Sequence, residues 1–432
     1  MNKLFFSCLC IAVLLCCGAC KQSTENKAEQ QSENIIPLRI DKPYYVDKFS
    51  NLFSKVRYVP LEETQNSIIG ELTELLVTNN GDFIVFDLFG EGVFRFAPDG
   101  KFLNNIGVKG PGPNEYIRPM DVEYDPFTDK VLVWDNGASS ILTYSLDGKM
   151  EHKIKLPWII NKIGIIDKEH LICYMNHGEF LKEGETAYNY KVIRRDGAIV
   201  KEFGEYGAEM NGFWPPKTNV FCCQLGRGLC HPPLSNTLYS MENKSLNAVA
   251  IFDLGEKAIP ENWKKSPYKD YKQKRKENRN LLELNEIYES EYYFVIRAQN
   301  IRSYILCLVE KETKEIKSLA LDLINDLYGL EGVPSIRNVH NNEVYFCTIP
   351  ESFEYVREQL KSLPEDESFE EAYKIMKNKS TTYIAEEFGE EAAKAYADSL
   401  MSAEIKLHPG EKEFICRMAE TSNPILQICT LK

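Results

Sequence analysis

The chain has 432 residues, of which 44% are hydrophobic and 27% are charged. This is the composition of a folded globular protein, and it argues against a disordered chain, a collagen-like repeat or a polytopic membrane protein. The 64 acidic and 51 basic residues give a net charge of −13. A nucleic-acid-binding protein needs a basic surface to displace phosphate counterions, so this class of partner is not expected.

The first residues have the pattern of a secretion signal. Lys3 provides the positive start, residues 4–17 form an apolar run too short to span a membrane, and Gly18-Ala19 precede Cys20. This arrangement resembles a bacterial lipoprotein signal, in which the cysteine is lipidated and becomes the new N-terminus. Residues 1–19 are therefore interpreted as the signal peptide and Cys20 as the lipidation site, with ordinary cleavage and release as the alternative.

Residues 20–50 are expected to be the lipidated cysteine and a flexible tether, because residues 21–35 are polar and lack aromatic side chains. A lipid and a tether would hold a folded body at a membrane without inserting it. We therefore expect an outer-membrane lipoprotein of the cell envelope, facing the periplasm or the exterior, with a monomeric body.

Cysteine usage predicts neither a disulfide framework nor a metal site. Five of the thirteen cysteines lie in the signal, and most of the others lie in apolar runs, where a buried thiol acts as a small hydrophobic group. Cys222-Cys223 and Cys230-His231 form the only cluster, and it lacks the paired spacing of structural zinc sites. No metal or cofactor is expected.

From residue 72 onward, short apolar runs and tight turns alternate as in consecutive β-hairpins. The turn Asp99-Gly100 recurs as Asp147-Gly148 and as Asp196-Gly197, at spacings of 48 and 49 residues. A four-stranded unit repeated every 40–50 residues is typical of a β-propeller. The three copies therefore predict the first three blades.

Later runs predict three more blades, with strands at 220–225, 228–231, 236–241 and 248–252, then at 287–299, 303–309 and 316–321, and finally at 335–339, 343–349 and 424–431. The last blade is one strand short. Residues 55–61 would complete it and close the ring. The predicted fold is thus all-β: a six-bladed propeller over residues 51–432, closed by an N-terminal strand and carrying insertions at 256–285 and 350–423.

The segment Val108-Lys-Gly-Pro-Gly-Pro-Asn-Glu-Tyr116 and the Asp-Gly-Lys turns resemble the six-bladed β-propeller lipoproteins of Bacteroidetes, which are similar to NHL-repeat propellers. The residues 55–61 and the ending Asn423-Pro-Ile-Leu-Gln-Ile are also similar to that family. The family pattern has one glycine where this chain has Pro113-Asn114. The resemblance implies a fold and a location, and it implies no reaction.

Strands alternate in direction within a blade, so the connections alternate between two faces. The Asp-Gly turns lie on one face, and the long connections lie on the other, which we call the long-loop face. Loops on a rigid scaffold usually carry binding surfaces. The long connections include residues 176–187 with His177, residues 206–217 with Trp214, and both insertions.

The insertions carry two further patterns. Basic residues crowd positions 264–279, which indicates either an anionic partner or a solvated helix face. In the second insertion, Phe369, Tyr373 and Met376, and then Ala392, Tyr396 and Leu400, recur at helical spacing. Helices that dock on the propeller are expected there.

No nucleophile, zinc or nucleotide motif is present, so catalysis is uncertain and is not favoured. The first hypothesis is a non-catalytic module that binds a glycan, a peptide or an envelope protein through the long-loop face. The alternative is a lyase or hydrolase centred in the channel, and a third is an architectural component of the envelope. The ligand-binding candidates are Glu115, Tyr116, His177, Trp214, His231, Asn338 and His340. For Glu115 and Tyr116 the competing interpretation is packing between blades.

Overall fold

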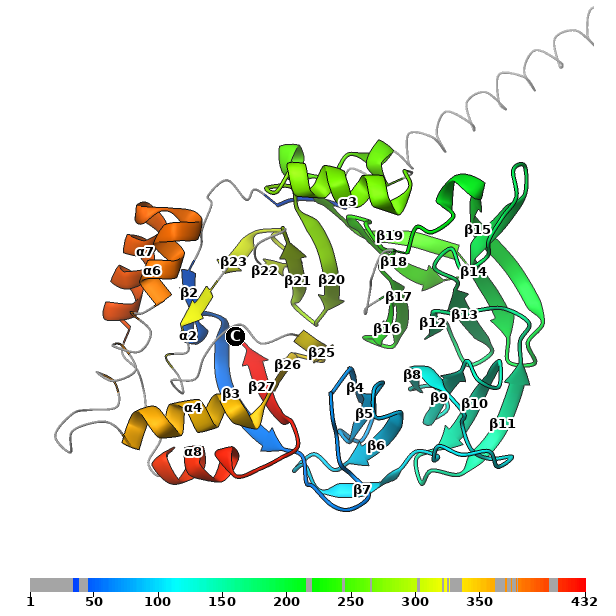
Figure 1. Cartoon of the computed structure of the whole chain (residues 1–432), viewed down its shortest axis with the longest axis horizontal. Helices are drawn as coiled ribbons and strands as arrows, with labels where there is room; N and C mark the ends of the chain where they lie inside the picture. Colours follow the sequence, from blue (N-terminus) through cyan, green and yellow to red (C-terminus); the bar gives the residue numbers. More distant parts are fainter. Residues whose placement is uncertain are drawn as a thin grey trace, which may run out of the picture.

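The computed structural model describes residues 34–38, 46–214, 220–242, 245–264, 266–300, 304–320, 322–324, 326, 336–361, 370, 374, 378, 380–403 and 411–432. The signal peptide and Cys20 lie outside the described residues. Six small antiparallel sheets stand around a central axis (Figure 1), as the sequence predicts. The fold is a six-bladed β-propeller.

Blades 1 to 3 follow the regular repeat. Blade 1 consists of β4 (Glu74–Val77), β5 (Phe83–Asp87), β6 (Gly92–Phe96) and β7 (Phe102–Asn105). Blade 2 consists of β8 (Pro119–Asp125), β9 (Lys130–Asp135), β10 (Ser140–Ser145) and β11 (Met150–Lys155). Blade 3 consists of β12 (Lys162–Ile165), β13 (His170–Tyr174), β14 (Thr186–Arg194) and β15 (Ile199–Gly207).

Blade 4 consists of β16 (Phe221–Gln224), β17 (Arg227–Cys230), β18 (Thr237–Glu242) and β19 (Ser245–Asp253). Blade 5 consists of β20 (Glu283–Glu289), β21 (Tyr293–Gln299), β22 (Tyr304–Glu310) and β23 (Ile316–Ala320). The expected single run at 287–299 is therefore wrong. A tight turn divides it, in which the Ser290 N–H donates to the carbonyl of Tyr293 and the Ser290 hydroxyl accepts the Tyr293 N–H.

Blade 6 closes the ring. It consists of β25 (Ile336–His340), β26 (Glu343–Thr348), β27 (Ile425–Leu431) and, as its outer strand, β3 (Phe53–Pro60). β3 pairs antiparallel with β27, with Val59 opposite Leu426 and Lys55 opposite Thr430. The predicted closure of the last blade by the N-terminal strand is confirmed, so the two ends of the body are held in one sheet.

A repeated aspartate helps to explain the 48-residue period. Asp87 ends the second strand of blade 1 and accepts the N–H groups of Gly70 and Gly90, each at 2.7 Å. Asp135 occupies the same place in blade 2 and accepts the N–H groups of Ile117 and Arg118. Each buried carboxylate thus ties its blade to the connection that leads into it.

Two short strands lie within the segment 20–50 that we expected to be a tether. β1 (Ile35–Pro37) pairs parallel with β19, and β2 (Val46–Lys48) pairs parallel with β24 (Asp322–Ile324). The short helix α2 (Phe49–Leu52) follows. Ile36 and Leu38 pack among residues of blades 4 and 5, and the burial of these apolar side chains holds the strand in place.

The first insertion contains two 3-10 helices, η2 (Gly255–Lys257) and η3 (Glu261–Trp263), and the helix α3 (Tyr268–Glu277). The second contains α4 (Pro350–Lys361), α6 (Ser380–Phe388), α7 (Glu390–Met401) and α8 (Glu411–Ala419). One further 3-10 helix, η1 (Ala208–Met210), follows β15. The first insertion joins two blades and the second joins the middle strands of blade 6. Both therefore leave from the long-loop face.

The predicted helical pattern of the second insertion is confirmed where the chain is described. Ala392, Tyr396 and Leu400 on α7 are buried together with Phe353 of α4 and Ile425 of β27. The helices thus pack against the outside of blade 6, where Figure 1 shows them gathered at one edge of the ring. Phe369, Tyr373 and Met376 lie outside the described residues.

Candidate functional site

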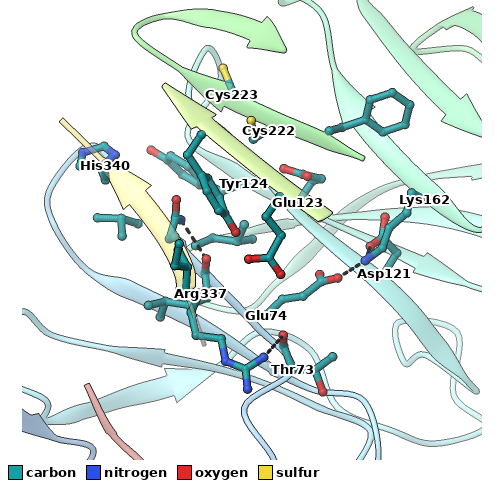
Figure 2. A pocket seen from close by; sticks show the side chains of 18 of the residues that line it. Thr73, Glu74, Asp121, Glu123, Tyr124, Lys162, Cys222, Cys223, Arg337 and His340 are labelled. Atoms are coloured by element: carbon teal, nitrogen blue, oxygen red, sulfur yellow. Dashed lines mark hydrogen bonds and ion pairs between the residues drawn. The ribbon is translucent and has the colours of Figure 1, made fainter. Parts of the chain in front are cut away.

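A cavity of about 190 Å³ occupies the centre of the ring. The inner strands of all six blades contribute to it, namely β4, β8, β12, β16, β20 and β25. Figure 2 shows charged side chains from several of these strands pointing into the space. Every blade therefore contributes to this cavity.

A buried ion cluster ties three of these strands together. The ammonium group of Lys162 on β12 donates to the carboxylate of Glu74 on β4, and to that of Asp121 on β8 at 2.6 Å. The second Asp121 oxygen accepts the backbone N–H of Ile163 at 2.6 Å. The exposed fraction of each side chain in the cluster is 15% or less. Removal of the lysine would leave two carboxylates buried without a counter-charge.

The protonation of the cluster follows from this packing. Burial raises the pKa of Asp121 against the opposing effect of Lys162, and the neighbouring Glu74 adds to the rise. Burial also opposes the charge of Lys162, but the two carboxylates outweigh it and raise the pKa of the lysine. Lys162 therefore stays charged, and the two acids compete for one cation.

Glu123 and Arg337 line the same cavity but take no part in this cluster. Glu123 lies two residues after Asp121 on β8, and Figure 2 shows its carboxyl group directed toward the middle of the cavity. Burial, followed by the charges of Asp121 and Glu74, raises the pKa of Glu123 well above its ordinary value. Arg337 enters from β25 and donates to the carbonyl of Thr73 at 3.4 Å.

Two of the predicted candidates, Asn338 and His340, line this cavity. Both lie on β25, and the Asn338 side chain donates to the carbonyl of Leu75 at 2.8 Å, which joins blade 6 to blade 1. Burial lowers the pKa of His340, so its ring is neutral at neutral pH. The structure thus brings these two candidates together with charged groups that were not singled out from the sequence.

Two other candidates, His177 and Trp214, lie together on the long-loop face. The Trp214 ring N–H donates to the carbonyl of His177 at 3.3 Å. The His177 ring packs edge-on against Tyr206 and Phe213, with centroids 4.8 and 5.7 Å apart. Burial lowers the pKa of His177 to about 4, so this ring also is neutral at neutral pH. Neither side chain reaches the channel.

Large apolar side chains surround this pair at the surface. Ile159, Phe180 and Trp214 are 65%, 86% and 59% exposed, and they come from three connections of the long-loop face. A Cβ atom on Gly178, next to His177, would lie 3.7 Å from the Ile159 side chain, so these connections touch. We call Ile159, His177, Phe180 and Trp214 the aromatic corner.

Tyr116 packs between blades, whereas Glu115 contacts glycines of its own loop. The Tyr116 ring is 2% exposed and meets the Tyr144 ring edge-on at 6.4 Å, within a core shared by blades 1 and 2. Burial raises its pKa to about 12. The Glu115 carboxylate accepts the N–H of Gly112 at 2.7 Å, and a Cβ on Gly110 or Gly112 would collide with it. Both residues thus shape their own loop.

The last candidate, His231, is 1% exposed at the end of β17, and its ring lies 2.8 Å from the carbonyl of Ser235. It supports a turn. Cys222 and Cys223 line the central cavity as thiols whose pKa burial raises. Within the part of the chain that the structure describes, no three His, Cys, Asp or Glu side chains are grouped to hold a metal ion.

The sequence carried a signal for the channel that we did not use. Asp121 and Glu123 alternate with the buried Val122 on an inner strand, so their side chains share one face and point away from the core. Lys162 and Arg337 gave no such sign, because each is a single basic residue near the start of a short strand. Only the closed ring brings them to the same cavity.

Each described helix is too short or too polar to cross a lipid bilayer. Comparison with curated proteins finds no match. Among solved structures, the chain is similar to a candidate exported protein of Bacteroides fragilis, with 12% identity over 92% of this chain and 99% of that chain and a TM-score of 0.63. This likeness supports the propeller fold.

Two further likenesses are weaker. A member of the DUF4221 family from Bacteroides vulgatus shares 12% identity over 68% of this chain and 92% of that chain, with a TM-score of 0.44. Virginiamycin B lyase of Staphylococcus aureus shares 12% identity over 68% and 81%, with a TM-score of 0.38. The family model described as a domain of unknown function, DUF4934, matches residues 34–382. That match covers most of the propeller, and the chain belongs to the DUF4934 family.

Proposed function

We propose that this protein is an envelope-anchored binding module that docks a partner protein on its long-loop face, with the aromatic corner at the centre of the contact. The observation that carries the proposal is the exposure of Ile159, Phe180 and Trp214 in one place. Single exposed apolar residues are common on protein surfaces, but a contiguous group usually marks an interaction site. Tryptophan in particular often dominates the energy of such contacts.

The aromatic corner is held firmly from below. Asn211, in the connection after β15, joins it to the connection between β13 and β14. Its side chain accepts the N–H of Leu181 at 3.0 Å and donates to the Leu181 carbonyl at 2.7 Å. Phe213 is buried beneath the corner against Tyr206, His177 and the aromatic rings of α3. A surface that is already ordered loses little conformational entropy when a partner binds, which favours affinity.

The basic segment lies beside this corner. Tyr268 and Tyr271 of α3 pack edge-on against Phe213, with ring centroids 5.7 and 5.9 Å apart. Lys269, Lys272 and Lys276 of the same helix are exposed. An apolar centre with a basic rim suits a partner protein whose own apolar patch is bordered by acidic residues, because complementary charge speeds the encounter.

The proposed location at the cell envelope is supported mainly by the sequence. The signal-like residues 1–19 and Cys20 support export and lipid attachment, and the likeness to a candidate exported protein agrees with that location. Attachment to a membrane would raise the local concentration of this surface near other envelope proteins. An anchored propeller would then serve as a fixed docking platform.

The geometry favours binding over the alternative of a lyase or hydrolase in the channel. Of the three histidines among the candidate residues, His340 lines the cavity, while His177 and His231 lie elsewhere. Two of the carboxylates that line the channel, Glu74 and Asp121, are paired with Lys162. Among the described residues, a general acid and base are thus not paired around a common reaction centre.

The proposal can be tested by affinity capture from crosslinked native membranes. A variant with Trp214→Ala and Phe180→Ser should recover the partner about tenfold less than the wild type, because the central contacts are lost. Phe127→Ser is the matched control, since Phe127 is 40% exposed on the β8–β9 turn of the opposite face. Equal recovery by the corner variant and the control would refute the proposal.

A further inference from the structure

The central channel contains two groups of opposite charge, Glu123 and Arg337, for which the described residues supply no ion-pair partner. Glu123 makes no hydrogen bond or ion pair with any described residue, although the neighbouring Asp121 and Glu74 are both bonded to Lys162. The carboxyl group nevertheless points into the cavity (Figure 2). The side chain is partly buried and opens onto the cavity, so its carboxyl oxygens are available to accept hydrogen bonds from a ligand there.

Arg337 is the corresponding cation. Its Nη1 atom donates to the Thr73 carbonyl at a long 3.4 Å, and the guanidinium also lies beside the Cys347 thiol. Its Nε atom is buried and has no hydrogen-bond partner in the part of the chain that the structure describes. No carboxylate of the described residues lies within ion-pair distance of it, whereas Arg297 in the same cavity is paired with Glu286 at 3.3 Å. A guanidinium with free donors is suited to a carboxylate.

Several simpler occupants fit this arrangement less well. A divalent cation needs several oxygen ligands, but Glu74 and Asp121 already share Lys162, and the described residues form no group that could hold a metal ion. A simple anion would satisfy Arg337 and be repelled by Glu123. A simple amine would satisfy Glu123 and leave Arg337 unmatched. The cavity is also smaller than the roughly 300–1,000 Å³ of sites for drug-sized ligands.

We infer that the channel binds a small zwitterion that carries a primary ammonium group and a carboxylate, such as a free amino acid or a dipeptide. Glu123 accepts hydrogen bonds from the ammonium group, and Arg337 donates to the carboxylate. Asn338 and the phenol of Tyr124 line the same space as additional polar contacts. This site is separate from the aromatic corner, so it goes beyond the docking function proposed above.

Binding of such a ligand would release a proton. Burial and the neighbouring carboxylates raise the pKa of Glu123, so without a ligand the group keeps its proton to a higher pH than an ordinary glutamate does. An ammonium group beside it stabilises the ionised form and expels the proton. Affinity should therefore increase as the pH rises. The titratable and charged groups around Glu123 are Asp121, Asp125, Glu74, Lys162, Cys222, Cys223, Glu286, Arg297, Arg337 and His340.

Calorimetric titration of the purified full-length chain tests this inference. The probes are the twenty standard amino acids and the dipeptide Ala-Ala, each also as its N-acetylated and its C-amidated form. At least one free zwitterion should bind with a Kd below about 1 mM, and either blocking group should weaken it at least about tenfold. Whether amino acids or the dipeptide bind more tightly distinguishes the two sources of this chemistry.

Two variants assign the contacts. Glu123→Gln and Arg337→Met should each weaken binding about tenfold or more, while the exposed-site controls Glu205→Gln and Arg279→Met should leave it within about twofold. Thermal unfolding shows whether each variant is folded, and the blocked ligands test the same contacts without any change to the protein. The inference is overturned if no probe binds at about 10 mM, if blocked and free probes bind equally, or if both channel variants bind as the wild type does.

Discussion

The central channel and the aromatic corner belong to one propeller but are built in opposite ways. The channel gathers charged side chains from six inner strands that lie far apart in the sequence, and it buries them. The corner gathers apolar side chains from three connections between residues 156 and 214, and it exposes them above a buried aromatic support. In the channel, several of the polar groups that line the cavity also hold blades together, as Lys162 and Asn338 do. At the corner, support and contact surface are separate groups.

The largest expected change in the free energy of unfolding follows from the loss of Lys162 in the channel. Lys162→Met would leave Glu74 and Asp121 buried without a cation, and loss of one partner of a buried ion pair typically costs about 3–5 kcal/mol. Lys153→Met, at an exposed position of β11, should change the free energy of unfolding by less than about 0.5 kcal/mol. Chemical denaturation at pH 7 measures both. A similar small change in the two variants would show that the ion cluster does not hold the blades.

A second substitution in the same channel should act in the opposite direction. The pKa of Glu123 is raised in the folded protein, so the stability linked to this group is present below its ordinary pKa of 4.5 and is lost as the pH rises through the higher folded value. Glu123→Gln removes that loss and should stabilise the protein by about 1–2 kcal/mol at pH 9.

At pH 4, below the ordinary pKa of 4.5, the same variant should have nearly the stability of the wild type. Thermal unfolding at the two pH values checks this pattern. Destabilisation by Glu123→Gln at pH 9 would indicate that the carboxylate has a structural partner after all.

The corner has its own, smaller pH dependence. Burial lowers the pKa of His177 from 6.5 to about 4, so its contribution to stability is present above pH 6.5 and is lost as the pH falls toward 4. The expected loss is about 1 kcal/mol, because the ring is only partly buried. His177→Asn should remove this pH dependence, because the asparagine side chain does not titrate. Asparagine also tolerates the positive φ of 55° at this position. The free energy of unfolding of the wild type and of His177→Asn should be measured between pH 7 and pH 4.5. If it falls equally with pH in both proteins, other groups cause the acid sensitivity.

The smallest effect on folding is expected at the surface of the corner. Trp214→Ala loses one hydrogen bond of 3.3 Å to a backbone carbonyl, and the side chain is more than half exposed. We expect a change in unfolding free energy of less than about 0.5 kcal/mol. By contrast, Phe213→Ala beneath it should cost about 3 kcal/mol, because a buried aromatic ring is lost. Equal effects of the two variants would mean that support and contact surface are not separate.

The sequence predicted what depends on local patterns. Asp-Gly turns at a nearly constant spacing predicted the first three blades. The incomplete last blade predicted a closing strand at 55–61, which β3 confirms. The turn at Ser290 was missed because Ser-Glu-Tyr is not a typical turn sequence and apolar residues flank it. Ile36 and Leu38 were missed as part of the body because two apolar residues among polar ones form no period.

Which candidate residues lie together depends on contacts between distant segments, and no local sequence pattern carries that information. Trp214 and His177 were proposed as separate loop residues, and the structure joins them through a hydrogen bond across 37 positions. Asn338 and His340 were predicted as ligand-binding candidates, but Lys162 and Glu123, which line the same cavity, come from other blades. Contacts of this kind are set by ring closure, so they become visible only when all six blades are in place.

Site-specific photo-crosslinking in intact cells tests the docking surface most directly. A photoreactive amino acid would replace Phe180 in the aromatic corner or, as the control, Phe127 on the opposite face, and adducts would be resolved by mass after irradiation. If the aromatic corner docks a partner protein, we expect a discrete protein adduct from position 180 that disappears when Trp214→Ala is added, and none from position 127. Adducts of equal yield from both positions, or none from position 180, would contradict it.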